Sequence, residues 1–345
     1  PKGNFITTNT TWTVCASGCT YSKVEDAWNQ ASQSRFINGA SLTVNIADGT
    51  YHVAGTLTTN NPDMINTRII GNTAHPENVV LEFDGVVSIA VVVANGGGLG
   101  GLFGVTLSRP MDGTGDLKSG DFSTLTSAVW SANTTAAVYD TDNGTITELE
   151  NVVITGFANG VYVDRGSQLW SSGPLTINNY GSWGIYVTTG GVAYFQGTSV
   201  GPESTSTTIP IAVDVVSDGF VSMRGATITS AQIGVVAGEV SGAELNNTTI
   251  SNCNTGIEAD IKSGINATNL TIKSAADAIL SLRASAIIGR TVTITGATRP
   301  VHAEHMGEVY LTDTLARITN SGSSYIAPNA SANGYSWIGG SAFVN

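Results

Sequence analysis

Apolar residues recur about every 22 residues through the second half of the chain. Four isoleucines mark one phase of this repeat, namely Ile228, Ile250, Ile272 and Ile294. Two more apolar positions follow each of them, at Val235, Ile257, Ile279 and Val301 and at Ala243, Ile265, Ile287 and Val309. Three short strands per unit predict an all-β fold, a right-handed parallel β-helix in which each unit is one coil. One coil cannot bury its inward face alone, so neighbouring coils must stack.

The repeat extends beyond these four units. It continues backward through Val200, Ile177 and Ile154 and forward to Ile318, which predicts regular coils over about 151–337. A Ser/Thr-rich insertion at 203–208 lengthens one step. Upstream of residue 151 the spacing of the apolar residues is less regular, but strand-like runs continue at 42–46, 68–70, 79–83, 86–93, 102–107 and 136–139. The polar, Gly-rich segment 110–135 is expected to loop out of the coils.

An N-terminal cap is predicted over residues 1–40, ahead of a β-helix over 41–345. Ser22 and Glu25 have the spacing of a capping box, which predicts a helix over 22–33. Its apolar residues fall on one face at Val24, Ala27, Trp28 and Ala31. A helix placed there would cover the open end of the apolar stack.

Composition and charge narrow the possible partners. Glycine makes up 41 of 345 residues and charged residues only 12%, which fits stacked coils with many tight turns. The net charge of −12 argues against nucleic acid and anionic membrane as partners. The longest apolar stretch, 86–94, is far too short to span a bilayer, so no membrane insertion is expected.

The three cysteines predict no metal centre. Cys15 and Cys19 are close enough to close a small disulfide loop, although their spacing equally allows two free thiols. A metal site would need further ligands nearby in sequence, so neither a metal nor another cofactor is expected. Cys253 lies in a turn of the repeat and is predicted to be a buried, inert thiol.

Several strings resemble a known family. They are Leu42-Thr-Val-Asn-Ile-Ala-Asp-Gly-Thr-Tyr51, Arg68-Ile-Ile-Gly-Asn72, the glycine-rich run 95–107, and the coils with Gly-Val-Tyr-Val and Gly-Ile-Tyr-Val at 160–163 and 184–187. Together with the preceding helix, they resemble the β-helical tailspikes and tail fibres of bacteriophages.

That resemblance implies a homotrimer on a virion. It would act extracellularly at the host surface, where it would bind, and often cleave, a bacterial capsule or O-chain polysaccharide. Contacts with other tail proteins would be made by a part preceding Pro1. The Asn-Thr-Asp, Gly-His-Gly and Arg-x-Pro-x-x-Arg strings of pectin-active β-helices are absent, and 14 lysines and arginines would poorly neutralise a uronate polymer.

Catalytic candidates come from the register, because no catalytic motif is present. The outward position of the second strand forms a column across coils, holding Tyr162, Tyr186, Asp214, Val236, Glu258, Leu280, His302 and Ile326. A second column, two residues further on, holds Asp164, Thr188, Val216, Gly238, Asp260, Leu282 and Glu304. The catalytic candidates are Glu258, Asp260, Asp214, Glu304 and His302.

Glycoside hydrolysis needs one protonated and one ionised carboxyl group. Glu258 and Asp260 are predicted on one strand face with their Cα atoms about 7 Å apart, within the range of inverting enzymes. Alternatively, these acids are ordinary solvated residues, with Lys262 pairing Asp260, or the rim of a subunit interface. His302 is either an acid/base group or a surface histidine.

Aromatic side chains form the predicted sugar-binding patch. Trp170, Tyr162, Tyr186, Trp183 and Tyr194 fall on outward or loop positions of two consecutive coils. Exposed aromatic faces stack on sugar rings, and equally serve subunit contacts. Two functions therefore remain open: a polysaccharide depolymerase, with a hydrolase favoured over a lyase, and a non-enzymatic tail-fibre adhesin or shaft.

Overall fold

The computed structural model describes residues 4–84, 87, 89–109, 136–201, 210–312, 317–319 and 335–338. The chain divides into a first compact unit, 1–181 with 204–208, and a second, 182–203 with 209–345. The predictions for segment 110–135, the insertion 203–208 and Ile326 lie outside the described residues. The described strands pair in parallel and stack as coils of a right-handed parallel β-helix, as the repeat predicted.

The first unit holds the described α-helix, α1 (Val24–Ser32), and two short 3-10 helices at Pro62–Asn66 and Pro76–Asn78. Its described strands belong to five parallel sheets, one of which has only two strands. One sheet joins β5 (Gly49–Val53), β8 (Val79–Phe83), β12 (Thr106–Ser108), β16 (Val152–Thr155) and β19 (Leu175–Asn178), and another joins β6 (Leu57–Thr59), β9 (Ile89–Val93), β13 (Ala136–Asp140) and β17 (Asn159–Val163). A third sheet joins β10 (Gly98–Leu99), β14 (Thr145–Ile146) and β18 (Gln168–Ser171). A fourth joins β2 (Thr10–Val14), β4 (Leu42–Ile46), β7 (Thr67–Ile70), β11 (Gly101–Phe103) and β15 (Leu149–Glu150). The two-stranded sheet pairs β1 (Asn4–Ile6) with β3 (Ser34–Phe36).

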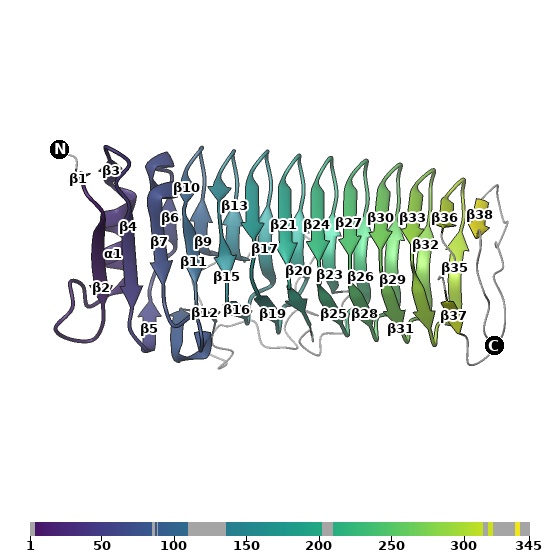
Figure 1. Cartoon of the computed structure of the whole chain (residues 1–345), viewed down its shortest axis with the longest axis horizontal. Coiled ribbons are helices and arrows are strands. Elements are labelled where there is room, and N and C mark those ends of the chain that lie inside the picture. The colour runs from purple at the N-terminus through teal and green to yellow at the C-terminus, as the bar shows by residue number, and fades with distance from the viewer. Residues whose placement is uncertain are drawn as a thin grey trace. The chain divides into compact units, whose positions relative to one another are not determined.

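The second unit contains three parallel sheets, one for each strand of the repeat (Figure 1). The first-strand sheet comprises β22 (Ser199–Val200), β25 (Thr227–Thr229), β28 (Thr249–Ser251), β31 (Thr271–Lys273), β34 (Thr293–Thr295) and β37 (Arg317–Thr319). The second-strand sheet comprises β20 (Trp183–Val187), β23 (Ile211–Val215), β26 (Ile233–Ala237), β29 (Thr255–Ala259), β32 (Asp277–Ser281) and β35 (Arg299–Ala303). The third-strand sheet comprises β21 (Val192–Gln196), β24 (Phe220–Arg224), β27 (Gly242–Asn246), β30 (Gly264–Thr268), β33 (Ala286–Arg290), β36 (Glu308–Thr312) and β38 (Tyr335–Ile338).

The register confirms the apolar repeat position by position. Ile228 pairs with Ile250, Ile250 with Ile272, and Ile272 with Ile294. The second and third apolar positions of the repeat pair in the same way, at Val235, Ile257, Ile279 and Val301 and at Ala243, Ile265, Ile287 and Val309. Each fully buried isoleucine contributes roughly 1.5–3 kcal/mol relative to exposure, so the stack of inward anchors stabilises the solenoid.

Turns between strands depend on residues that accept a left-handed backbone. Asn247, Asn252 and Asn269 have φ values of 54°, 56° and 54°. Asparagine visits this region more readily than other non-glycine residues, which explains its recurrence at the corners of the coils. These corners direct each new strand onto the next sheet and so fix which residues of one coil share a face.

The helix α1 buries the face that its spacing predicted. Val24, Ala27, Trp28 and Ala31 are 0–3% exposed, and the Trp28 indole donates a hydrogen bond of 2.9 Å to the Thr58 carbonyl. The predicted capping box is wrong. The N-cap is Lys23, without a side-chain cap, and Glu25 instead accepts the Ala54 N–H at 3.1 Å.

Of the two alternatives for Cys15 and Cys19, a disulfide or two thiols, the structure has the disulfide. This disulfide closes the loop after β2. Cys253 is a buried thiol, as predicted.

Candidate functional site

The outward column of the second-strand sheet is formed as predicted within the second unit. Tyr186 pairs with Asp214, Asp214 with Val236, and Val236 with Glu258. The column continues through Leu280 to His302. The register of the stacked strands therefore places an aromatic ring, two acids and a histidine in one line.

Asp214 is the acid in this column whose pKa is most strongly displaced. It lies on β23 and is 7% exposed. Burial raises its pKa to about 7, and the negative charges of Glu239 and Glu258 act in the same direction. The hydrogen bond donated by the Trp183 indole opposes this shift without cancelling it. Near neutral pH, Asp214 can therefore hold a proton and release it.

Glu258 is the second acid of the column and is half-buried on β29. Burial raises its pKa, and the nearby charges of Asp260 and Asp277 raise it further, while the Arg283 guanidinium lowers it. Burial thus raises the pKa of both carboxyl groups, which is how enzymes adapt carboxylic acids to general acid–base catalysis.

The separation of Asp214 and Glu258 follows from the coil spacing. Two steps of about 4.8 Å place their Cα atoms about 10 Å apart. This Cα separation is slightly above the distance between the carboxyl groups themselves in inverting glycosidases, about 6.5–9.5 Å. Val236, the residue between them, is only 9% exposed and leaves an apolar surface there. An apolar surface between two carboxyls helps to keep one of them protonated.

Asp260 follows the last residue of β29 and is engaged with a cation. The Arg283 guanidinium, one coil on, donates to both of its carboxylate oxygens, and the Ile261 N–H donates to Oδ1 at 2.8 Å. The sequence had suggested Lys262 as the partner. These three donors all bind the Asp260 carboxyl as an acceptor, so Asp260 is well placed to orient Arg283.

His302 and Glu304 lie together one coil beyond Leu280. The His302 Nε2 atom is 2.7 Å from Glu304 Oε1, and its Nδ1 atom is 3.6 Å from Asp277 Oδ1. At 5% exposure His302 is buried, so the alternative of a surface histidine is wrong. The Arg299 guanidinium pairs with Asp277 and completes a compact charged cluster.

The predicted aromatic patch is divided between two sheets in each unit. In the second unit, Trp183 and Tyr186 stack on β20 with ring centroids 4.7 Å apart, beside Asp214. Tyr194 lies on β21 of the third-strand sheet, 6.1 Å from the Phe220 ring. In the first unit, Tyr162 lies on β17 and Trp170 on β18 of another sheet. The aromatic pair next to the acids is therefore Trp183 with Tyr186.

A second acidic cluster lies in the first unit. Asp140 is fully buried at the end of β13, and burial raises its pKa to about 8, with the negative charge of Asp164 adding to the effect. Asp164 accepts a hydrogen bond of 3.1 Å from the Tyr139 hydroxyl, and the Tyr139 ring lies 4.8 Å from that of Tyr162. Asp140 lies on the same face of β13 as the buried residues Ala136 and Val138, so its carboxyl points into the interior of the coil.

Sequence reasoning missed the partners of these acids. Arg283 lies 23 residues after Asp260 and Arg299 lies 22 residues after Asp277, about one repeat in each case. Opposite charges one repeat apart are therefore the signal that would have found both pairs. Among the residues described here, no group of three or more His, Cys, Asp or Glu side chains is arranged to hold a metal ion. The described helices include none that is long and apolar enough to cross a membrane.

Comparison with known proteins gives a likeness of fold. No family model matches the chain, and no curated protein matches it. Among solved structures, it is similar to the catalytic domain of a GH87 α-1,3-glucanase in complex with nigerose, with a TM-score of 0.53 and 11% identity over 99% of this chain and 69% of that one. A variant of such a domain in complex with tetrasaccharides gives a TM-score of 0.52 and 11% identity, with the same coverage. At this identity the likeness establishes the parallel β-helix fold.

Proposed function

We propose that this chain binds a polysaccharide and hydrolyses it at the Asp214–Glu258 column. The observation that carries the proposal is the pairing of a buried acid of pKa about 7 with a second, half-buried acid two coils along the same sheet face. Asp214 would act as the general acid that protonates the leaving oxygen, and Glu258 as the base that activates water.

The aromatic pair supports the sugar-binding half of this proposal. Trp183 and Tyr186 stack beside Asp214 and provide a ring surface next to the acid, where a sugar ring can pack by its C–H face. The GH87 catalytic domains of similar fold bind nigerose and tetrasaccharides, which is consistent with a glycan as the ligand class.

We further propose that the protein acts at the bacterial surface as part of a bacteriophage tailspike or tail fibre. The support is the resemblance of its sequence strings at 42–51, 68–72 and 95–107 to those proteins, together with the Cys15–Cys19 disulfide, which is typical of proteins outside the cytoplasm.

The trimer that this role implies needs an apolar contact face. Ile288 and Tyr310 pair across β33 and β36 and are 47% and 37% exposed, and light scattering of the purified chain would give its subunit number.

A non-enzymatic adhesin is the second candidate, and one observation favours it. Asp260 and Glu304, two of the five predicted catalytic residues, already contact Arg283 and His302. Ionisable side chains held in such pairs can have a structural role as readily as a catalytic one.

The experiment that separates the two functions is incubation with a panel of capsular and O-chain polysaccharides and α-1,3-glucan. Products are measured by size and mass. New reducing ends without unsaturation support hydrolysis, whereas unsaturated ends indicate a lyase. Binding to a polysaccharide without any cleavage would support the adhesin and overturn the hydrolase.

A further inference from the structure

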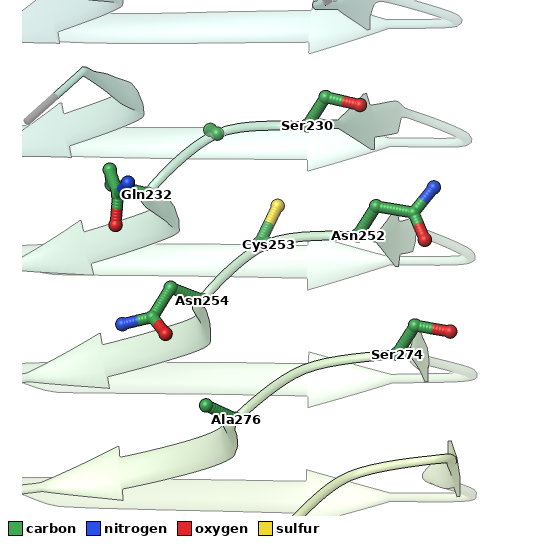
Figure 2. A pocket seen from close by; sticks show the side chains of 8 residues that line it. Ser230, Gln232, Asn252, Cys253, Asn254, Ser274 and Ala276 are labelled. Carbon is green, nitrogen blue, oxygen red and sulfur yellow. The ribbon is translucent and has the colours of Figure 1, made fainter. Parts of the chain in front are cut away.

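A polar groove runs across three coils of the second unit. It lies where the chain passes from the first-strand sheet to the second-strand sheet, and it has a volume of about 490 Å³ (Figure 2). Its lining residues are Ser230, Ala231, Gln232, Asn252, Cys253, Asn254, Ser274 and Ala276. This volume falls within the range of small-molecule sites, about 300–1,000 Å³.

The repeat gives the groove its shape. Figure 2 shows Ser230, Asn252 and Ser274 in one row and Gln232, Asn254 and Ala276 in another, with Cys253 between them. The residues between the rows are small and buried: Ala231 is 5% exposed and Cys253 is 3% exposed. Small residues in the floor and longer polar residues at the sides leave a trough that follows the stacking direction.

The backbone of the groove is fixed by hydrogen bonds between coils. The Asn252 N–H donates to the Lys273 carbonyl at 3.0 Å, and the Asn254 N–H to the Ala231 carbonyl at 3.3 Å. The Asn254 carbonyl in turn accepts from the N–H groups of Ala276 and Asp277, at 2.9 and 3.0 Å. The backbone that carries the polar side chains is therefore fixed before any ligand binds, which lowers the entropic penalty of binding.

The side-chain amides of the groove keep their hydrogen-bonding capacity. At the neighbouring corner of the coils, the Asn269 amide donates to the Asn247 side-chain oxygen at 2.9 Å. Within the part of the chain that the structure describes, Asn252 and Asn254 make no such side-chain pair, although they recur in the same repeat. Each amide offers two donors and one acceptor oxygen to a ligand.

The groove is electrically neutral, although the chain carries a net charge of −12. Its lining has amides, hydroxyls and one thiol, and no charged side chain. A polyanion would meet no cation here and would be repelled by the protein as a whole. A neutral chain rich in hydroxyl or acetamido groups matches the lining instead, because each of its groups can both donate and accept.

We propose that this groove is a binding subsite for a neutral segment of a glycan chain. The proposal rests on the proposed function and adds to it the substrate class and a second place of contact. Asn254 precedes Glu258 by four residues, which at about 3.3 Å per residue places the groove about 13 Å from the acid column. A glycan several sugars long, or a branch of one, can therefore occupy both.

The test observes the side-chain amide signals of Gln232, Asn252 and Asn254 by NMR, assigned with single alanine variants. The neutral probes are nigerose, an α-1,3-linked glucotetraose and an N-acetylglucosamine tetramer. Each is compared with an anionic polygalacturonate oligomer. We expect at least one neutral probe to shift the three groove signals and the anionic oligomer to leave them in place. The Asn266 amide, which is exposed on β30 of the third-strand sheet, is the internal control.

The double variant Asn252→Ala with Asn254→Ala is expected to bind that neutral probe about tenfold more weakly, since it loses two or more hydrogen bonds. Asn266→Ala, the matched control, should bind as the wild type does. If no probe shifts the groove signals, the subsite proposal is overturned whether or not a polysaccharide is cleaved. If the groove signals shift and no polysaccharide of the panel is cleaved, the subsite stands and the hydrolase proposal fails.

Discussion

Asp214 and Glu258 lie in one column of the second-strand sheet with Val236 between them. Burial raises the pKa of both carboxyl groups, to about 7 for Asp214. A parallel β-helix makes this arrangement possible because residues one repeat apart are neighbours in space. The same column carries Tyr186 before the acids, so the sheet presents an aromatic ring and two acids in one line.

The pH dependence of cleavage should reflect Asp214. The general acid must be protonated, so kcat/KM is expected to fall as pH rises through about 7, the pKa of Asp214. On the acid side, activity should fall as Glu258 becomes protonated, at a pH above the ordinary range of a glutamate because burial raises its pKa. Initial rates over pH 4–9 measure both limbs. Constant activity up to pH 9 would exclude Asp214 as the acid.

The products should have inverted stereochemistry. The Cα atoms of Asp214 and Glu258 are about 10 Å apart, which leaves room for a water molecule between the base and the sugar. Proton NMR of the first product formed, before mutarotation, is expected to show the anomer opposite to that of the cleaved linkage. Retention of configuration would mean a closer carboxyl pair than the one described.

Asp140 should make the protein less stable as pH rises. Its pKa is about 8 in the folded chain against 3.8 as the ordinary value, so the folded state binds more protons than the unfolded state between these pH values. The free energy of unfolding therefore falls from about pH 4 to pH 8, by at most about 6 kcal/mol.

Replacement of this carboxyl tests the effect. Asp140→Asn is expected to melt at a higher temperature than the wild type at pH 8, with the difference vanishing near pH 4. Asp142→Asn, which changes a more exposed acid of the same turn, is the control and should change the melting temperature little. A lower melting temperature of Asp140→Asn at pH 8 would show that the buried carboxyl is stabilising instead.

The pair of Asp260 and Arg283 should be structural. Removal of the guanidinium in Arg283→Met leaves the buried Asp260 carboxylate without its cation, so the melting temperature should fall. The double variant Arg283→Met with Asp260→Asn removes both charges and should recover part of that loss. Thermal melts of the two single variants and the double variant measure the coupling. Strictly additive losses would argue that the two side chains act independently.

Periodicity predicted most of the fold and the column of the candidate site. Ile228, Ile250 and Ile272 occupy equivalent positions because the period of 22 residues is unbroken there, and the same arithmetic aligned Asp214 with Glu258. These predictions depend only on the count of residues per coil, which the sequence contains directly.

Features that depend on the corners of the coils were not predictable in this way. Ile261 and Lys262 take left-handed conformations, with φ of 49° and 59°, and Asp260 pairs with Arg283 of the following coil instead of Lys262. A similar corner at Thr189 and Gly190 places Tyr194 on a different sheet from Tyr186. Neighbours in sequence are therefore separated by a corner, whereas residues one repeat apart meet.

The most direct test of the hydrolase is a comparison of wild type, Asp214→Asn, Glu258→Gln and the control Glu244→Gln on a polysaccharide that the protein cleaves. Glu244 lies on β27 of the third-strand sheet, away from the acid column. The measurement is the rate of release of reducing ends, with binding of the intact polysaccharide determined in parallel. We expect both column variants to lose at least about a hundredfold in rate while they still bind, and Glu244→Gln to retain wild-type activity. Cleavage at the wild-type rate by Asp214→Asn or Glu258→Gln would contradict the assignment of the reaction to this column.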